Sequence, residues 1–348
     1  MENGPLTLRT YIVSRILLTI PMIFILLTTV FLIMRVLPGD PVLLHFEKME
    51  NPALIAEMRI RLGLDKPLPV QYVDYLIGLF RGDLGKSMQD YSSVGQQVFS
   101  AFPATLELAI FSMAIAVLIG VLLGVESSKA YNSPKDHLIR VFGIVTYAIP
   151  VFFLGMILQM IFGVGLHWLP IGGRTYQTMV PTGLSIGSLH FSTGLYTVDS
   201  LLEGNIVKFG TSLKYLFLPS LTLGLALCGI FVRLTRSNMF ETLRLDFVTA
   251  AKARGLKDST VTYSYALRNA FLPVLTMMGL QFALLLGGAV LTETTFSWPG
   301  LGRYLIDRIN FRDYTAIQGV VVVFGLFVSL VSLGIDLLYA YLDPRIRL

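Results

Sequence analysis

The chain has 348 residues, of which 54% are hydrophobic and only 14% are charged, and its formal net charge is +5. Soluble domains average about 25% charged residues, so this composition excludes an ordinary soluble protein and indicates one embedded in lipid. Long uncharged runs agree, because a helix needs about 20 apolar residues to cross a bilayer. These runs lack the period-2 alternation of membrane strands. The sequence therefore predicts an all-α integral membrane protein.

Six transmembrane helices are expected. The predicted spans are 16–36, 103–125, 138–164, 215–233, 270–292 and 314–342. Residues 175–198 form a seventh candidate, but polar residues and proline fill more than half of that stretch, which is too polar for insertion. We therefore predict that 165–214 is a loop outside the membrane. The first span is too long for a secretory signal peptide, and no small-residue cleavage site follows it.

The basic residues predict the orientation. With six spans, both termini (1–15 and 343–348) share one side with the loops at about 126–140 and 233–269. That side carries 14 of the 27 Lys and Arg residues on about half as much chain as the other side. The positive-inside rule therefore predicts that it is cytoplasmic. Topology explains the positive net charge, so no nucleic-acid partner is predicted.

The outer region 37–102 is predicted to contain short helices. Asn51 is a candidate N-cap for the first, with Gly63 past its end. A second helix follows, with one apolar face. That face consists of Val70, Val73, Ile77 and Phe80. Two roles remain open for these helices, either packing onto the membrane bundle or docking a partner.

No motif for nucleotide or metal binding is found. Gly85-Lys86-Ser87 looks like the end of a phosphate-binding loop, but that motif needs a glycine five positions before the Gly-Lys pair, where Phe80 stands. The single cysteine, Cys228, and four scattered histidines form no metal-ligand cluster. Any ATP hydrolysis must therefore take place on another chain.

The stretch "FVTAAKARGLKD", residues 247–258, predicts a short helix at the cytoplasmic membrane surface. Phe247, Ala250 and Ala251 share one face with Leu243, and Gly255 suits a left-handed C-cap. Another helix restarts at Asp258 or Ser259 and runs towards the fifth span. The small residues predict a flat surface that another protein can approach closely.

This stretch resembles the EAA loop of ABC-importer permeases, and the chain is similar to the B-type permease subunits of dipeptide and oligopeptide importers. The resemblance covers nearly the whole chain. Besides "TAAKARGL…ALRNAFLPV", it rests on "FLIMRVLPGDPV" (31–42), "RLGLDKPLPVQYVDYL" (61–76), "RGDLGKS" (81–87), "PATLELA" (103–109), "LPSLTLGL" (218–225), "RLTRSNM" (233–239), "GGAVLTETTFSWPGLGRYLID" (287–307) and "DLLYAYLDPRIR" (336–347). Thr249 stands where this motif usually begins with an acidic or small polar residue, and it departs only from the literal motif name.

The resemblance implies a type I ABC importer permease fold of six transmembrane helices, with a permease core at 103–342 and a helical insertion after the first span. It also implies a set of partners. These are a homologous C-type permease subunit, two cytoplasmic ABC ATPase subunits that bind ATP and Mg²⁺, an extracytoplasmic substrate-binding protein and membrane lipid. This chain itself is expected in the cell membrane as a multi-pass protein. No cofactor is expected on this chain, which is expected to have no enzymatic activity of its own.

Within that scheme the loop 234–269 couples the chain to its ATPases through a helix at about 243–255. The residues expected to make this contact are Phe247, Thr249, Ala250, Ala251, Arg254, Gly255 and Leu256. Charges inside a membrane are costly and usually functional or paired. Glu107, Gln281 and Glu293 are candidates for the translocation path, although burial between helices is an equal alternative for Glu107 and Gln281. Asp336 is expected to pair with Arg15 in a structural role.

Alternatives stay open on substrate and class. Relatives of this family carry oligosaccharides or metal chelates as well as peptides. A secondary transporter or channel that works alone would show inverted repeats and buried ionisable relays, and neither is evident. A membrane-embedded enzyme is disfavoured because the histidines lie outside the spans without a pairing motif.

Overall fold

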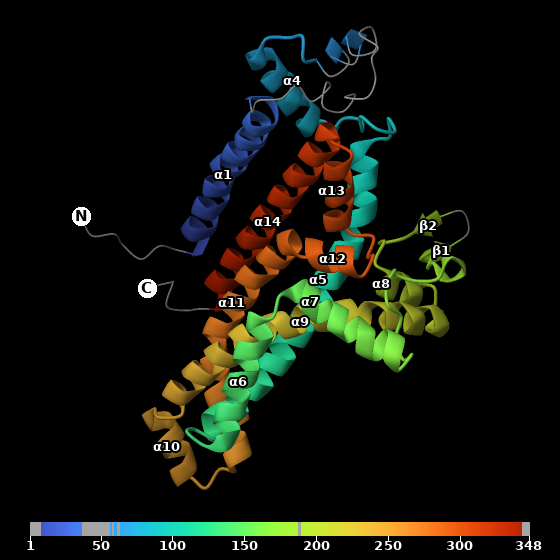
Figure 1. The fold of residues 1–348 in the computed structure, drawn as a ribbon. Helices are drawn as coiled ribbons and strands as arrows, with labels where there is room; N and C mark the ends of the chain where they lie inside the picture. The colour runs from blue at the N-terminus through green and yellow to red at the C-terminus, as the bar shows by residue number, and fades with distance from the viewer. Residues whose placement is uncertain (1–7, 37–55, 58, 61–62, 187–188, 343–348) are drawn as a thin grey trace, which may run out of the picture. The chain divides into compact units, whose positions relative to one another are not determined.

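The computed structural model describes residues 8–36, 56–57, 59–60, 63–186 and 189–342. Two compact units are formed, one by Met1–Pro103 with Gly300–Leu348 and the other by Ala104–Pro299. Both are predominantly helical (Figure 1). The helix predicted to start at Asn51 lies largely outside the described residues.

The first unit is built around the helices from the two ends of the chain. Its elements are α1 (Leu8–Val36), α4 (Leu68–Phe80), the start of α5 (Val94–Lys129), α13 (Leu301–Asn310) and α14 (Tyr314–Leu342). In one apolar cluster, Leu27 and Val30 of α1 meet Val322 of α14. A second cluster joins Val94 and Val98 to residues of α13 and α14. These contacts hold chain segments that are more than 200 residues apart in the sequence.

The second short helix predicted outside the membrane is present as α4, and it packs through a different side from its predicted apolar face. The packed side chains are Tyr75, Leu76 and Leu79, which join the α1–α14 cluster. The predicted apolar face is exposed, and Phe80 is 87% exposed. That face consists of Val70, Val73, Ile77 and Phe80. Apolar residues line both sides of this helix, so periodicity alone did not identify the side that packs.

The second unit contains the remaining membrane helices and the long loop between them. Its elements are most of α5, α6 (Pro134–Ala148), α7 (Val151–Leu158), η1 (Gln159–Gly165), η2 (Gln177–Met179), β1 (Leu184–Ile186), β2 (Leu189–Phe191), α8 (Tyr196–Leu202), α9 (Ile206–Thr242), α10 (Asp246–Ala253), η3 (Thr260–Ala266), α11 (Leu267–Gly288) and α12 (Val290–Thr295). The strands β1 and β2 form an antiparallel hairpin, with Leu184 opposite Phe191. The sequence did not predict this hairpin, although it did place the segment in a loop.

The third predicted span, 138–164, is bent rather than continuous. The segments Pro134–Ala148 and Val151–Gly165 meet at an angle of 104°. Pro150 causes the break, because its ring lacks an N–H donor and forces the preceding residue out of the helical region. Ile149 is indeed extended, with φ −73° and ψ 128°.

Three of the other helices, α1, α5 and α9, are longer than predicted, whereas α14 has the predicted bounds. In the described part of the chain, five helices are long and apolar enough to cross a membrane, and the bent pair makes six. The helix α9 is 37 residues long and α5 is 36, whereas the uncharged runs marked only about 20 residues of each. A polar helix end outside lipid keeps its backbone hydrogen bonds, so composition locates the bilayer-spanning part and not the helix end.

Glycines allow the helices of the second unit to cross closely. A Cβ placed on Gly229 of α9 would lie 2.2 Å from the carbonyl oxygen of Gly143 in α6. Likewise, a Cβ on Gly120 of α5 would lie 2.3 Å from Cβ of Phe231 in α9. Small residues at crossings are the usual basis of helix packing in membranes. The backbones of α6 and α9 are therefore in direct contact at this point.

We expect Gly229→Ala to lower the thermal midpoint of the purified chain, because overpacking a tight contact costs about 1–3 kcal/mol. The matched control is Gly287→Ala in α11, where an added Cβ meets nothing within 4 Å. Alanine should leave that helix equally stable or slightly more so. Equal midpoints for the two variants, measured in the same detergent, would contradict a close α6–α9 crossing.

The Gly85-Lys86-Ser87 stretch has a structural role in the first unit. Gly85 adopts φ +85°, and Ser87 Oγ donates a hydrogen bond to Asp313 Oδ2 over 2.5 Å. Asp313 also accepts the Met88 N–H, so the loop is fixed to the start of α14. Nearby, hydrogen bonds from Ser92 hold the pKa of Asp90 well below its usual range, and the charge of Arg308 adds to the effect.

Candidate functional site

The predicted coupling helix is present as α10, shorter than expected. It spans Asp246–Ala253, within the predicted 243–255, and lies at the end of the second unit away from the β1–β2 hairpin (Figure 1). Lys252 lies in its last turn, where a cation is favoured by the helix dipole. After Arg254, Gly255 has φ +73° and no neighbour near its missing Cβ, so glycine is needed there for the left-handed turn alone.

The face of α10 that is free to meet a partner differs from the predicted one. Ala251 is 5% exposed and packs with Val248 in the unit's own core, next to Met239 and Val261. Phe247 lies at the edge of the same cluster. Ala251 is therefore buried within this chain rather than exposed as expected, and its role in coupling stays a prediction. The sequence did not predict Val248 as a core residue. Because Val248 and Ala251 are both buried in this cluster, the buried face of α10 does not include Ala250, which is exposed.

The outward surface of this segment consists of small and charged residues flanked by leucines. Thr249, Ala250 and Arg254 are exposed, and Leu256 beyond the turn is 36% exposed. At the other end Leu245 is 50% exposed. With Gly255, five of the seven residues expected at the ATPase contact are exposed, and their role in coupling stays a prediction.

Glu107 forms the centre of a buried polar site in the second unit. Its Oε2 lies 2.6 Å from Nη2 of Arg174, and its Oε1 accepts hydrogen bonds from the N–H and the hydroxyl of Thr197, both at 2.7 Å. The two charged side chains are 3% and 6% exposed. Arg174 also donates to the Gly194 carbonyl and covers the ring of Tyr196, 3.7 Å from its centroid. The burial alternative is thus what the structure shows for Glu107.

This site ties the long loop to a membrane helix. Arg174 and Thr197 belong to the loop after η1, whereas Glu107 belongs to α5. Within the same loop, the buried carboxylate of Asp199 accepts the N–H groups of Thr193 and Gly194 at 2.8 and 2.9 Å. The loop is therefore a folded element held by two buried carboxylates.

The other path candidates occupy different environments. Glu293 in α12 is fully buried, and its Oε1 accepts a hydrogen bond from Thr105 over 2.6 Å. It does not lie on a surface of this chain, where a residue at an outer mouth would be expected. Gln281 is half-buried in α11 and its amide lies 3.6 Å from the sulfur of Met277. A path role for these residues remains a prediction.

Sequence reasoning missed Arg174, but a signal for it existed. Glu107 is the only charged residue in 103–125, and Arg174 is the only one in 141–198. Two isolated opposite charges in long uncharged stretches are strong candidates for a pair, because an unpaired buried charge is costly. Arg15 and Asp336, by contrast, were predicted from the sequence to pair. The structure confirms the pair, with 3.4 Å between Arg15 Nη1 and Asp336 Oδ2, and the two side chains are 42% and 38% exposed.

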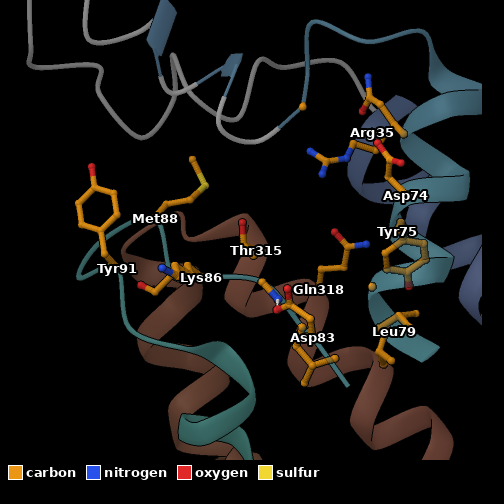
Figure 2. Close-up of a pocket in the computed structure, with 18 residues that line it drawn as sticks. Arg35, Asp74, Tyr75, Leu79, Asp83, Lys86, Met88, Tyr91, Thr315 and Gln318 are labelled. Atoms are coloured by element: carbon orange, nitrogen blue, oxygen red, sulfur yellow. Dashed lines mark hydrogen bonds between the residues drawn. The ribbon is translucent and has the colours of Figure 1, made fainter. Parts of the chain in front are cut away.

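A cavity of about 800 Å³ opens in the first unit between α1, α4, α14 and the loop 83–91. Figure 2 shows Arg35 and Asp74 on one side and Lys86 on the other, with Gln318 between them. Asp74 already pairs with Lys66 at 2.7 Å, whereas no ion pair of Arg35 or Lys86 is recorded within the described ranges. Asp83 adds a second carboxylate to the lining, so the cavity carries both basic and acidic side chains and its charge alone favours no class of ligand.

The fold and the charges define a polytopic helical membrane protein with a surface helix between two of its spans. The family comparison places it more narrowly. The model of the binding-protein-dependent transport system inner membrane component matches residues 116–348, and that of the N-terminal part of such components matches residues 8–109. The chain belongs to this family and is a membrane component of a transport system.

Close relatives cover the chain from end to end. The dipeptide transport system permease protein DppB of Alkalihalophilus pseudofirmus is 41% identical over 97% of this chain and 99% of its own length. The di/tripeptide transport system permease protein DppB of Pseudomonas aeruginosa is 40% identical over 97% and 98%. The glutathione transport system permease protein GsiC of Pectobacterium atrosepticum is 38% identical over the same shares. A crystal structure of an amino acid ABC transporter matches with a TM-score of 0.47 and 14% identity over 71% of this chain and 94% of its own.

Proposed function

We propose that this chain is the B-type permease subunit of an ATP-driven ABC importer for di- and oligopeptides. The observation that carries the proposal is the full-length similarity to permeases named for dipeptide, di/tripeptide and glutathione transport. The named solutes are all short peptides, which favours peptides over the oligosaccharides and metal chelates that the sequence left open.

In this proposal the chain supplies half of the translocation path and a homologous C-type permease supplies the other half. Two separate ATPase subunits bind ATP and Mg²⁺, and no cofactor binds to this chain. The exposed face of α10, from Thr249 to Leu256, enters a groove on one ATPase subunit. An extracytoplasmic binding protein delivers the peptide, and both termini lie in the cytoplasm. The positive charge of the loop that contains α10 supports this orientation.

The sharpest test is purification of the tagged full-length chain from membranes, followed by an ATPase assay of what accompanies it. We expect a second permease and ATPase subunits to co-purify, and ATP hydrolysis to rise when a binding protein loaded with a dipeptide is added. The unloaded binding protein and a sugar-loaded sample are the controls. A chain that purifies alone and moves solute in liposomes without ATP would contradict the proposal.

A further inference from the structure

A second cavity lies between α6 and α9 in the unit Ala104–Pro299, with a volume of about 610 Å³. Its lining is divided between a cationic and an apolar part. The guanidinium groups of Arg140, Arg233 and Arg236 belong to the first part. Ile144, Tyr147 and Ile230 belong to the second. The cavity is thus amphipathic and lies on two membrane helices.

The cationic part carries positive charge that the protein does not neutralise. Arg236 is paired, because its Nε and Nη2 lie 2.7 and 2.8 Å from the carboxylate oxygens of buried Asp136. Arg140 and Arg233 are exposed, and across the described segments neither has a recorded ion pair. No carboxylate lines the cavity. Two guanidinium groups with free hydrogen-bond donors match the planar, multi-oxygen geometry of a phosphate.

The apolar part continues onto the exposed side of α6. Tyr147 is 66% exposed and Ile144 is 65% exposed. Farther along the helix, Leu138 and Val141 are 71% and 55% exposed. A small inorganic anion would use the arginines but none of this surface. A molecule with an anionic group and a hydrocarbon tail would use both parts.

We propose that this cavity binds an anionic phospholipid of the cytoplasmic leaflet, with the phosphate at Arg140 and Arg233 and an acyl chain along Ile144 and Tyr147. The inference rests on the proposed orientation, which places these arginines at the cytoplasmic ends of their spans. Basic pockets between membrane helices on that side are suited to anionic headgroups. The bound lipid would fill the space beside the glycine contact of α6 and α9 and stabilise their crossing.

The test is native mass spectrometry of the full-length chain, purified with the subunits that accompany it and supplied with phosphatidylglycerol. We expect retained phosphatidylglycerol to fall about fivefold in Arg140→Gln and in Arg233→Gln, and further in the double variant. The matched control is Arg268→Gln, an exposed arginine at the start of α11 outside the cavity, which should retain the lipid. The zwitterionic phosphatidylcholine should be retained poorly by all forms.

A second measurement separates the lipid from a free anion. Phosphatidylglycerol should raise the thermal midpoint of the unsubstituted protein and much less that of the double variant, while inorganic phosphate should raise neither. Equal stabilisation by inorganic phosphate would overturn the assignment to lipid. Unchanged lipid retention in the double variant would overturn the site, whether or not the second permease stays bound to that variant. Intact peptide-stimulated ATP hydrolysis alongside either result would show that the proposed function stands without it.

Discussion

Replacing Ala250 by arginine is expected to abolish the stimulation of ATP hydrolysis by a peptide-loaded binding protein, while the chain remains folded and inserted. Ala250 is exposed on α10, so the new side chain does not disturb the unit's own core. At a close contact with an ATPase subunit, however, it adds a long charged group where a methyl group stood. Overpacking costs about 1–3 kcal/mol, and each 1.4 kcal/mol weakens binding about tenfold.

Two companion variants make this experiment specific. Ala250→Ser keeps the side chain small and should keep nearly full stimulation. Ala251→Arg forces a charge into the cluster of Val248 and Met239, so it should reduce the amount of folded chain rather than uncouple an intact complex. The measurement is the yield in membranes together with stimulated and basal ATPase activity. Normal stimulation in Ala250→Arg would place the coupling contact elsewhere in the loop.

The second large effect is expected at the buried ion pair of Glu107 and Arg174. Arg174→Gln leaves the Glu107 carboxylate without its cation at 3% exposure, and breaking such a pair from one side costs about 3–5 kcal/mol. Arg174→Lys keeps the charge but loses the second nitrogen contact and the stacking on Tyr196, so an intermediate loss is expected. The measurement is the free energy of unfolding in detergent.

The controls separate burial from pairing. Asp74→Asn breaks the exposed pair with Lys66, in which the Lys66 and Asp74 side chains are 47% and 52% exposed. This change should cost little stability, because water screens an exposed ion pair. The double variant Glu107→Gln with Arg174→Gln removes both charges and should recover part of the loss. A cost for Arg174→Gln no larger than that of Asp74→Asn would show that the pair does not hold the loop to α5.

Most of the fold was accessible from the sequence because lipid imposes a simple rule. A spanning helix must satisfy every backbone hydrogen bond internally and present apolar side chains over about 20 residues. Uncharged runs therefore identified the membrane helices, and the third run contains Pro150, a residue that bends or breaks a helix. The size of the bend, 104°, was not accessible, because a proline permits a range of angles and the neighbouring elements choose one.

The coupling helix illustrates the same division on a smaller scale. Gly255 was assigned correctly to the end of the helix, because capping acts within one turn. The exposed face was assigned wrongly at Ala251, which is buried. Alanines on adjacent faces of a helix differ too little in hydrophobicity to show which of them is buried. The packing of Val248 and Ala251 depends on α9 and η3, which approach α10 from other parts of the chain.

By itself, the sequence determined that the chain is a helical membrane protein, where its spans lie, which side its basic loops favour and which family it resembles. Those properties follow from local composition and from short motifs, which need no knowledge of distant contacts. Only the tertiary structure decided which charges are paired and which surfaces are free. Arg174 pairs with Glu107, whereas Arg140 and Arg233 line one cavity that also has apolar side chains and no carboxylate. Both outcomes depend on how segments far apart in the chain pack, since burial and charge neutralisation are properties of the folded chain.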